Sequence, residues 1–179
     1  MVGWRTRAGV MLALASVAFL SVSGAARGGE PEPKVDRILV KKAAHTITLF
    51  AGDRALYETT VAIGPGGSGP KRKEGDSTTP VGRYHIVSKG PSKYRVFLGL
   101  DYPNADDKKR FALAVKEGNL PKNARIGGDV GIHGAPPQRE WKSIHKSTDW
   151  TLGCVAVDDE EIDAIAKKVR VGTIVDIED

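Results

Sequence analysis

The chain has 179 residues, of which 40% are hydrophobic and 27% are charged, the usage of an ordinary globular domain. Its 21 glycines and 10 prolines indicate many turns and argue against a long coiled coil or helical bundle. The net charge is +5, but aromatic residues make up only 6% and no basic block is longer than Lys71–Lys73. This composition argues against a dedicated nucleic-acid-binding protein.

Residues 1–25 have the pattern of an export signal. Arg5 and Arg7 precede a mostly apolar run over 8–23, which ends in small residues at 23–25. The run is shorter than the about 20 apolar residues that a membrane-spanning helix needs. We therefore expect a signal peptide over 1–25, a short linker over 26–34 and one folded domain over 35–179, in an exported protein.

Most of the remaining chain has the patterns of β-strands. Polar and apolar residues alternate in 37–42 and 45–50, and residues 51–54 have the composition of a hairpin turn. Further strands are predicted at 56–63, 84–88, 96–100, 130–133, 154–157 and 173–177.

One helix is predicted near 159–169. Asp158 and Glu161 have the spacing of a capping box, an apolar stripe follows them, and Gly172 can end the segment. Because strands far outnumber helices, we expect a mainly β fold, a sandwich or barrel with a docked helix.

The sequence argues against a dinucleotide-binding loop and against a zinc site. Residues 64–69 match G-x-G-x-x-G, but Pro70 and the residues after it do not open the helix that a dinucleotide site needs, so a loop is predicted. The histidines do not have the close spacing of zinc ligands, and no metal site is expected. His145 lies in a segment that has the composition of an exposed loop.

Cys154 is the only cysteine, so an exported chain cannot use it for an internal disulfide. His133 ends one predicted strand and Cys154 begins another, an arrangement that can bring an imidazole to a thiol and activate it as a nucleophile. The competing interpretation is that both side chains are core packing. The chemistry of the two residues favours a catalytic pair. Its imidazolium would stabilise the anion, so that the thiolate of Cys154 would persist at pH values below the ordinary thiol pKa of about 8.5.

The segments around these residues resemble a known family. His133 followed, after an insertion, by Thr151-Leu152-Gly153-Cys154 is similar to the signature of L,D-transpeptidases of the YkuD type, the ErfK/YbiS/YcfS/YnhG family. Residues 79–86 resemble its T-P-x-G-x-F-x-I strand, 102–107 its Y-P-N-x-x-D segment, and 171–175 its closing V-G-T-x-V strand. The resemblance spans about residues 36–177.

The resemblance implies a fold and a reaction. The fold would be a mixed-strand β-sandwich or barrel with short helices. The reaction would be attack by Cys154 at the L-centre of a peptidoglycan stem peptide, with His133 as the base and release of a terminal D-amino acid. A second stem peptide or a lipoprotein would be the amine acceptor. No cofactor, metal or nucleic acid would take part, and the protein would work in the periplasm or at the cell wall.

Further residues receive roles from the same resemblance. The Gly134 carbonyl would orient the imidazole, and the amides of Leu152, Gly153 and Cys154 would bind the oxyanion. Thr151 and Trp150 would line the acyl pocket.

The sequence departs from the family pattern at two positions, where Leu152 replaces a His and Ala156 replaces an Arg. These departures leave open whether the acyl group passes to an amine or to water, so one alternative is a hydrolase on the same scaffold. The other alternative is a non-catalytic wall-binding domain with an inert thiol.

Overall fold

The computed structural model describes Met1 and residues 33–179. Apart from Met1, the predicted signal peptide lies outside the described residues, as does the predicted linker up to residue 32. Pro33 and Lys34 have no regular secondary structure. Neither α-helix of the described part has the length and hydropathy needed to cross a membrane.

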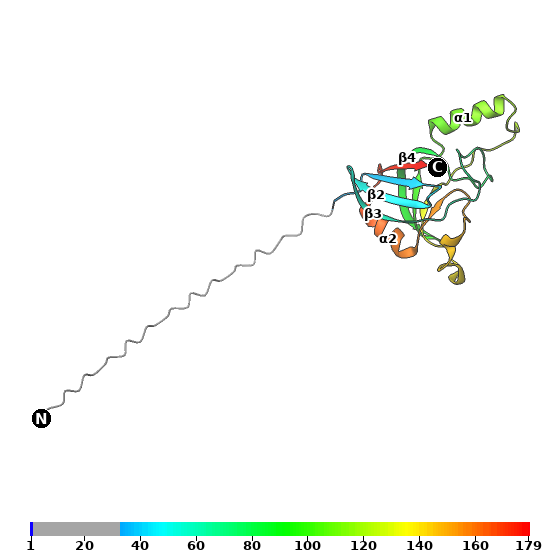
Figure 1. Ribbon diagram of the computed structural model, residues 1–179. Coiled ribbons are helices and arrows are strands. Elements are labelled where there is room, and N and C mark those ends of the chain that lie inside the picture. Colours follow the sequence, from blue (N-terminus) through cyan, green and yellow to red (C-terminus); the bar gives the residue numbers. More distant parts are fainter. Residues whose placement is uncertain (2–32) are drawn as a thin grey trace. The chain divides into compact units, whose positions relative to one another are not determined.

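The described residues contain eight strands in one mixed, curled sheet that forms a half-barrel (Figure 1). The strand order is β3-β2-β1-β8-β4-β5-β6-β7; β1–β8 and β6–β7 are parallel pairs and the other neighbours are antiparallel. This confirms the prediction of a mainly β fold with mixed strands, and each predicted strand overlaps one observed strand. The strands are β1 (Arg37–Lys41), β2 (Thr46–Ala51), β3 (Arg54–Thr60), β4 (Gly82–Ser92), β5 (Arg95–Leu100), β6 (Gly131–His133), β7 (Val155–Ala156) and β8 (Ile174–Glu178).

The core lies against the inner face of this sheet. Ile38 and Val40 of β1 are fully buried, and their register partners Val175 and Ile177 in the parallel strand β8 are buried beside them. The residues between them are more exposed, so the alternation in the sequence is the alternation between the two faces of the sheet.

A two-residue bridge joins the two ends of the sheet. Ala62, which follows β3, donates its N–H to the Ala156 carbonyl of β7 at 2.9 Å, and Ala156 returns a hydrogen bond at 2.8 Å. Since β3 and β7 are the outermost strands, this bridge curls the sheet on itself. It also places the chain after β3 beside the residues that precede β7.

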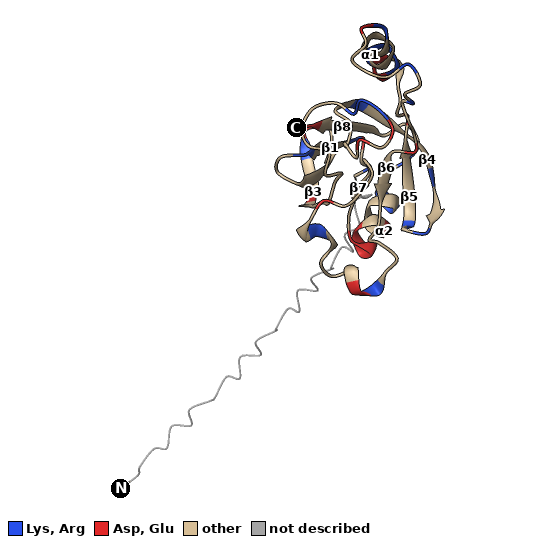
Figure 2. Cartoon of the chain, turned by 90° about the vertical axis from the view of Figure 1, so that its right-hand side faces the viewer, with Lys and Arg blue, Asp and Glu red and all other residues tan. Residues whose placement is uncertain are grey.

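Helix α2 (Asp159–Lys168) occurs where the sequence predicts it. Asp158 and Glu161 form the capping box, in which the Asp158 N–H donates to Glu161 Oε2 at 2.8 Å. The acidic first turn is visible in Figure 2. Ile162 and Ile165 are buried on the face that packs against β5 and β6.

A second helix, α1 (Ala105–Lys116), was not predicted. Asn104 caps it by accepting hydrogen bonds from the backbone of Asp106 and Asp107. Asp107 is its one buried residue, so it has no apolar stripe of the kind that identified α2. The available signal was the Asn104–Asp107 spacing, because Asp107 completes a capping box.

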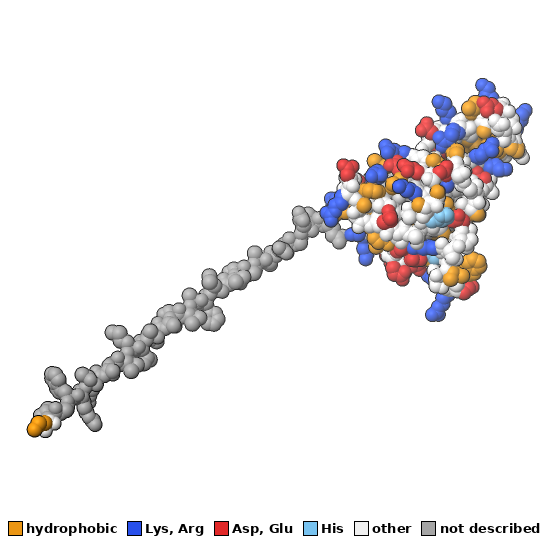
Figure 3. Space-filling model, in the orientation of Figure 1, with side chains coloured by type: hydrophobic (Ala, Val, Ile, Leu, Met, Phe, Trp, Pro, Cys, Tyr) orange, Lys and Arg blue, Asp and Glu red, His pale blue; other side chains and the backbone are white. Residues whose placement is uncertain are grey.

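Two short 3-10 turns, η1 (Arg139–Trp141) and η2 (His145–Ser147), lie in the segment between β6 and β7. On the face of the domain shown in Figure 3, acidic and basic side chains are interspersed.

Candidate active site

His133 and Cys154 lie on neighbouring parallel strands. His133 ends β6, and Cys154 immediately precedes β7. The register pairs His133 with Ala156 and Ile132 with Val155, so Cys154 lies opposite Gly131. Because residues two apart on a strand share a face, the thiol and the imidazole lie on the same side of the sheet.

Both side chains line one pocket of ≈ 570 Å³. Aromatic residues from β5, the β4–β5 turn and the segment before Cys154 form much of its wall, and Lys93 and Asp129 add charges of opposite sign. An apolar cavity with a few polar groups is the usual form of a small-ligand site. The lining residues are Ser92, Lys93, Tyr94, Phe97, Gly128, Asp129, Val130, His133, Trp150, Thr151, Leu152 and Cys154.

The His133 imidazole is 2% exposed and held by aromatic stacking. Its centroid lies 4.4 Å from that of Tyr94 with the planes 23° apart, and the Trp150 ring lies 5.7 Å away. Nδ1 donates to the Gly134 carbonyl at 2.8 Å, since a carbonyl can only accept. In the neutral ring, Nε2 is therefore the nitrogen that can accept a proton.

Close packing explains the glycine after His133. A side chain at Gly134 would place its Cβ 2.7 Å from the Tyr94 carbonyl and 2.7 Å from Asp159 Oδ1. Gly134 also donates its N–H to the Tyr94 carbonyl at 2.9 Å. The glycine thus allows the strand end to approach Tyr94, whose ring stacks on the imidazole.

Burial favours the neutral form of both reactive groups. It lowers the pKa of His133, an effect that the Gly134 hydrogen bond opposes. Burial raises the pKa of the Cys154 thiol, against the opposing effects of the Gly131 N–H and the Lys71 charge. The sulfur also lies 3.5 Å from the Asp129 carbonyl, to which a thiol can donate. Burial therefore opposes the expected resting thiolate, against the groups that stabilise the anion.

The turn before Cys154 is organised by Thr151. Its hydroxyl donates to the Cys154 carbonyl at 2.7 Å and accepts the Gly153 N–H at 3.2 Å. Gly153 has φ +126°, and a Cβ there would lie 2.7 Å from the Thr78 carbonyl, so only glycine fits. Thr151 reaches the pocket wall as expected, but its hydroxyl is used in the turn.

The geometry of the turn also bears on the predicted oxyanion donors. The Gly153 N–H already donates to Thr151, so the amides of Leu152 and Cys154 stay the candidates. The Leu152 side chain is 78% exposed, which makes its backbone the part that contributes to the turn. The amides of Trp150 and Thr151 both donate to the Ile63 carbonyl at 3.1 Å and tie the turn to the chain after β3.

Residues 35–177 match the family of L,D-transpeptidase catalytic domains known as YkuD. This chain belongs to that family. The matched segment contains β1 to β7, all of β8 except its last residue, and both His133 and Cys154. The resemblance predicted from the local motifs is thus confirmed.

Solved structures share the fold of this L,D-transpeptidase domain. The helical cell shape determining protein Pgp2 from Campylobacter jejuni is 23% identical, with a TM-score of 0.58 over 83% of this chain and 49% of its own. Bd1075 of Bdellovibrio bacteriovorus is 21% identical, with a TM-score of 0.55 over 83% of this chain and 49% of its own. This chain therefore spans about half the length of these two proteins.

An L,D-transpeptidase from Xylanimonas cellulosilytica is 12% identical, with a TM-score of 0.52 over 83% of this chain and 62% of its own. A search of the curated proteins finds no match to this chain.

Lys71 is buried beside the turn before Cys154, a position that the sequence did not predict. It lies in a basic run that has the composition of an exposed loop, yet its side chain is only 4% exposed. Its Nζ lies 2.6 Å from Asp76 Oδ1 and 3.4 Å from the Leu152 carbonyl. No periodicity in the sequence signals this burial, because the contact joins segments 81 residues apart.

The other histidines are placed away from a shared site. His145 is 1% exposed and lies 2.9 Å from Asp158, so the prediction that it occupies an exposed loop is wrong. The segment that carries His145 folds back on the first turn of α2, so the His145 ring is buried against Asp158. His45 and His85 contact Asp149 and Asp101, respectively. Among the described residues, no group of three or more His, Cys, Asp or Glu could hold a metal ion.

Proposed function

We propose that this protein is a peptidoglycan L,D-transpeptidase with Cys154 as the nucleophile and His133 as the general base. The observation that carries the proposal is that both side chains lie on one face of paired strands and line the same pocket. The hydrogen bond from Nδ1 to the Gly134 carbonyl supports the role of Nε2 as the proton acceptor.

The first half-reaction acylates the enzyme. As Cys154 Sγ attacks the carbonyl carbon at the L-centre of the stem peptide, its proton passes to His133 Nε2. The amides of Leu152 and Cys154 would stabilise the charge on the carbonyl oxygen. The C–N bond then breaks, the imidazolium returns the proton to the leaving nitrogen, and the terminal D-amino acid departs from a thioester on Cys154.

The second half-reaction transfers the acyl group to an amine, such as that of a second stem peptide or of a lipoprotein. The neutral imidazole takes the proton of the attacking amine, the C–S bond breaks, and the proton returns to sulfur. No cofactor enters these steps, since side chains supply both nucleophile and base. Water in place of the amine would make the same site an L,D-carboxypeptidase or endopeptidase.

The lining of the pocket suits a stem peptide. Lys93 is held over the Tyr94 ring, with Nζ 5.0 Å from the centroid, at the pocket that contains His133. A cation in this place can attract a carboxylate of the peptide. Tyr94 and Trp150 offer apolar surface to the aliphatic side chain at the L-centre.

Product analysis tests the proposal. Purified protein is incubated with a tetrapeptide muropeptide that ends in a D-amino acid, alone and with a second muropeptide as acceptor, and the products are read by mass spectrometry. We expect a dimer with the summed mass of the two muropeptides less the mass of the released D-amino acid, and no product from Cys154→Ala. A tripeptide without a dimer indicates the hydrolase. Binding to peptidoglycan without either product indicates a wall-binding domain.

The place of action is part of the same proposal. The basic start and apolar run of residues 1–25 support export to the periplasm or cell wall. Fractionation of cells that express the whole chain, with Arg5 and Arg7 both replaced by Glu as the comparison, tests it. The proposal is wrong if the unaltered protein stays in the cytoplasm.

A further inference from the structure

A buried ion pair lies behind the turn that precedes Cys154. Lys71 and Asp76 belong to the loop between β3 and β4, and their side chains are 4% and 15% exposed. Nζ and Oδ1 lie 2.6 Å apart, while Nζ also donates to the Leu152 carbonyl at 3.4 Å. Burial of an ammonium group is costly, even in an ion pair, and is repaid only when its partners are well placed.

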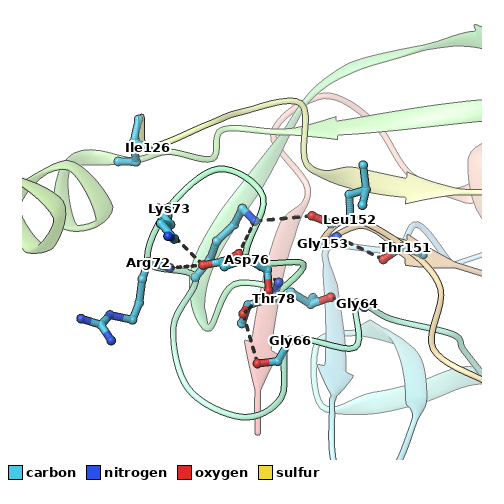
Figure 4. Close-up of polar contacts among 12 residues, drawn as sticks. Gly64, Gly66, Arg72, Lys73, Asp76, Thr78, Ile126, Thr151, Leu152 and Gly153 are labelled. Atoms are coloured by element: carbon cyan, nitrogen blue, oxygen red, sulfur yellow. Dashed lines mark hydrogen bonds and ion pairs between the residues drawn. The ribbon is translucent and has the colours of Figure 1, made fainter. Parts of the chain in front are cut away.

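Asp76 fixes the position of the pair. Its Oδ1 accepts the Thr78 N–H at 3.0 Å, and its Oδ2 accepts those of Arg72 at 2.7 Å and Lys73 at 3.0 Å (Figure 4). Burial alone would raise the pKa of this carboxyl, but the hydrogen bonds from Lys71 and these amides hold it below its usual range. The loop is thus folded around a carboxylate, which holds the ammonium group on the side of Leu152.

This loop packs tightly on the turn. A Cβ at Gly153 would lie 2.7 Å from the Thr78 carbonyl and 3.5 Å from Lys71 Nζ. Figure 4 shows Leu152, Gly153 and Thr151 against the loop that carries Asp76 and Thr78. The neighbouring Thr79 donates its hydroxyl to the Cys154 carbonyl at 3.3 Å. The ammonium group therefore lies against the residue directly before the nucleophile.

We propose that Lys71 is a positioning residue for Cys154. Its ammonium group holds the Leu152 carbonyl, fixes the orientation of the Leu152–Gly153 peptide, and places a positive charge where the sulfur and the oxyanion become negative. The inference rests on the proposed role of Cys154 as nucleophile. It gives a function to a cation that the acid–base steps do not use.

The charges around the thiol give this proposal a measurable consequence. The positive charge of Lys71 lowers the pKa of Cys154, while Asp129 and burial raise it. The other titratable groups that line the pocket are His133, Lys93, Tyr94 and Asp129. Removal of the Lys71 charge therefore makes the thiolate harder to form.

The experiment compares three variants. Lys71→Met keeps the length of the aliphatic chain and removes the charge, but it leaves Asp76 unpaired. Lys71→Met combined with Asp76→Asn removes both charges, which avoids an unpaired carboxylate. Arg72→Met is the matched control, because it removes one positive charge from an exposed position in the same loop. Each is assayed for thermal unfolding, for the pH dependence of Cys154 alkylation, and for kcat and KM.

In both Lys71 variants we expect the alkylation profile to move to higher pH, with the rate near neutral pH falling roughly three- to tenfold. We expect kcat to fall about tenfold with little change in KM, and Arg72→Met to behave as the unaltered protein. The proposal is overturned if the double variant is folded and keeps the alkylation profile and kcat of the unaltered protein, because Lys71 would then serve only loop stability.

Alkylation needs no peptidoglycan, so it separates the two proposals. An altered profile in the Lys71 variants of a protein that has no activity on muropeptides would refute the proposed function, while it would still show that the Lys71 charge acts on the thiol. Normal turnover of muropeptides by the unaltered protein, with the same alkylation profile in the Lys71 variants, would support the proposed function and refute the inference about Lys71.

Discussion

Burial favours the neutral forms of Cys154 and His133. Burial raises the pKa of the thiol and lowers that of the imidazole. A thiol and a neutral imidazole react by proton transfer during attack, rather than through a preformed ion pair. The hydrogen bond from His133 to Gly134 supports this reaction, because it leaves Nε2 as the acceptor.

Activity should persist below the ordinary pKa of imidazole. The base must be unprotonated, and burial lowers the pKa of His133 from its usual value of 6.5. We therefore expect the acid limb of kcat/KM to have its midpoint below pH 6.5, measured as D-amino acid release between about pH 4 and 8. A midpoint at or above 6.5 would show that burial does not lower the pKa of the catalytic base.

Removal of the nucleophile should separate activity from stability. In Cys154→Ala, the loss of one sulfur beside an open pocket should change the free energy of unfolding by no more than about 1 kcal/mol. Release of the D-amino acid should fall by roughly 10³-fold or more. Urea denaturation and mass spectrometry of the products check the two effects. Unchanged turnover would refute covalent catalysis by this residue.

At the level of the elements, the segment between β6 and β7 is fastened to the first turn of α2. His145 and Lys146 contact Asp158 at 2.9 Å each. The His145 ring lies 6.2 Å from that of Trp150, which lines the pocket. The capping residue of α2 therefore supports both the helix and one wall of the candidate active site.

Asp158→Ala should lower both the stability of the domain and the activity of the candidate site. Loss of the cap costs about 1 kcal/mol, and loss of the contacts to His145 and Lys146 adds to it. We also expect a severalfold drop in kcat/KM, because Trp150 loses the support of the segment packed against it. Glu160→Ala in the same helix turn is the control. Equal effects of the two substitutions on urea denaturation and turnover would contradict this assignment.

At the level of the whole domain, contacts distant in sequence close the curled sheet. The Ala62–Ala156 bridge joins its two ends. On the chain that follows β8, Asp179 lies 2.6 Å from Lys42 Nζ and accepts the Gly69 N–H at 2.8 Å. The Lys42 side chain is 3% exposed, so Asp179 provides the countercharge for a buried cation.

Asp179→Asn should destabilise the domain in a pH-dependent way. The hydrogen bond from Lys42 lowers the pKa of this carboxyl, so its stabilising effect is present above the ordinary carboxyl pKa and is lost as the pH falls through the lowered value. Because Asp179 is half exposed, we expect a loss of only about 1 kcal/mol near neutral pH. The control Glu178→Gln should have no effect in urea denaturation. A difference that persists at about pH 2 would contradict the ionic origin.

The predictions from sequence succeeded where a local pattern is repeated. Alternation located β1 and β2, and the Asp158–Glu161 spacing with its apolar stripe located α2. Helix α1 was missed because it packs almost no apolar surface, which leaves only its Asn104–Asp107 cap as a signal. His145 was misplaced because its burial depends on a contact with a helix that follows it in the chain.

The sequence by itself determined the mainly β class, the family, and the two residues of the candidate pair, since each depends on residue types at short spacing. Only the tertiary structure decided that Cys154 and His133 share a face, that burial shifts the pKa of each toward its neutral form, and that Lys71 lies against Leu152. Strand register sets the first, burial sets the second, and a contact between residues 81 positions apart sets the third. Residue spacing within a short segment predicts neither the strand register, nor the burial, nor the long-range contact, because each depends on which distant segments the fold brings together.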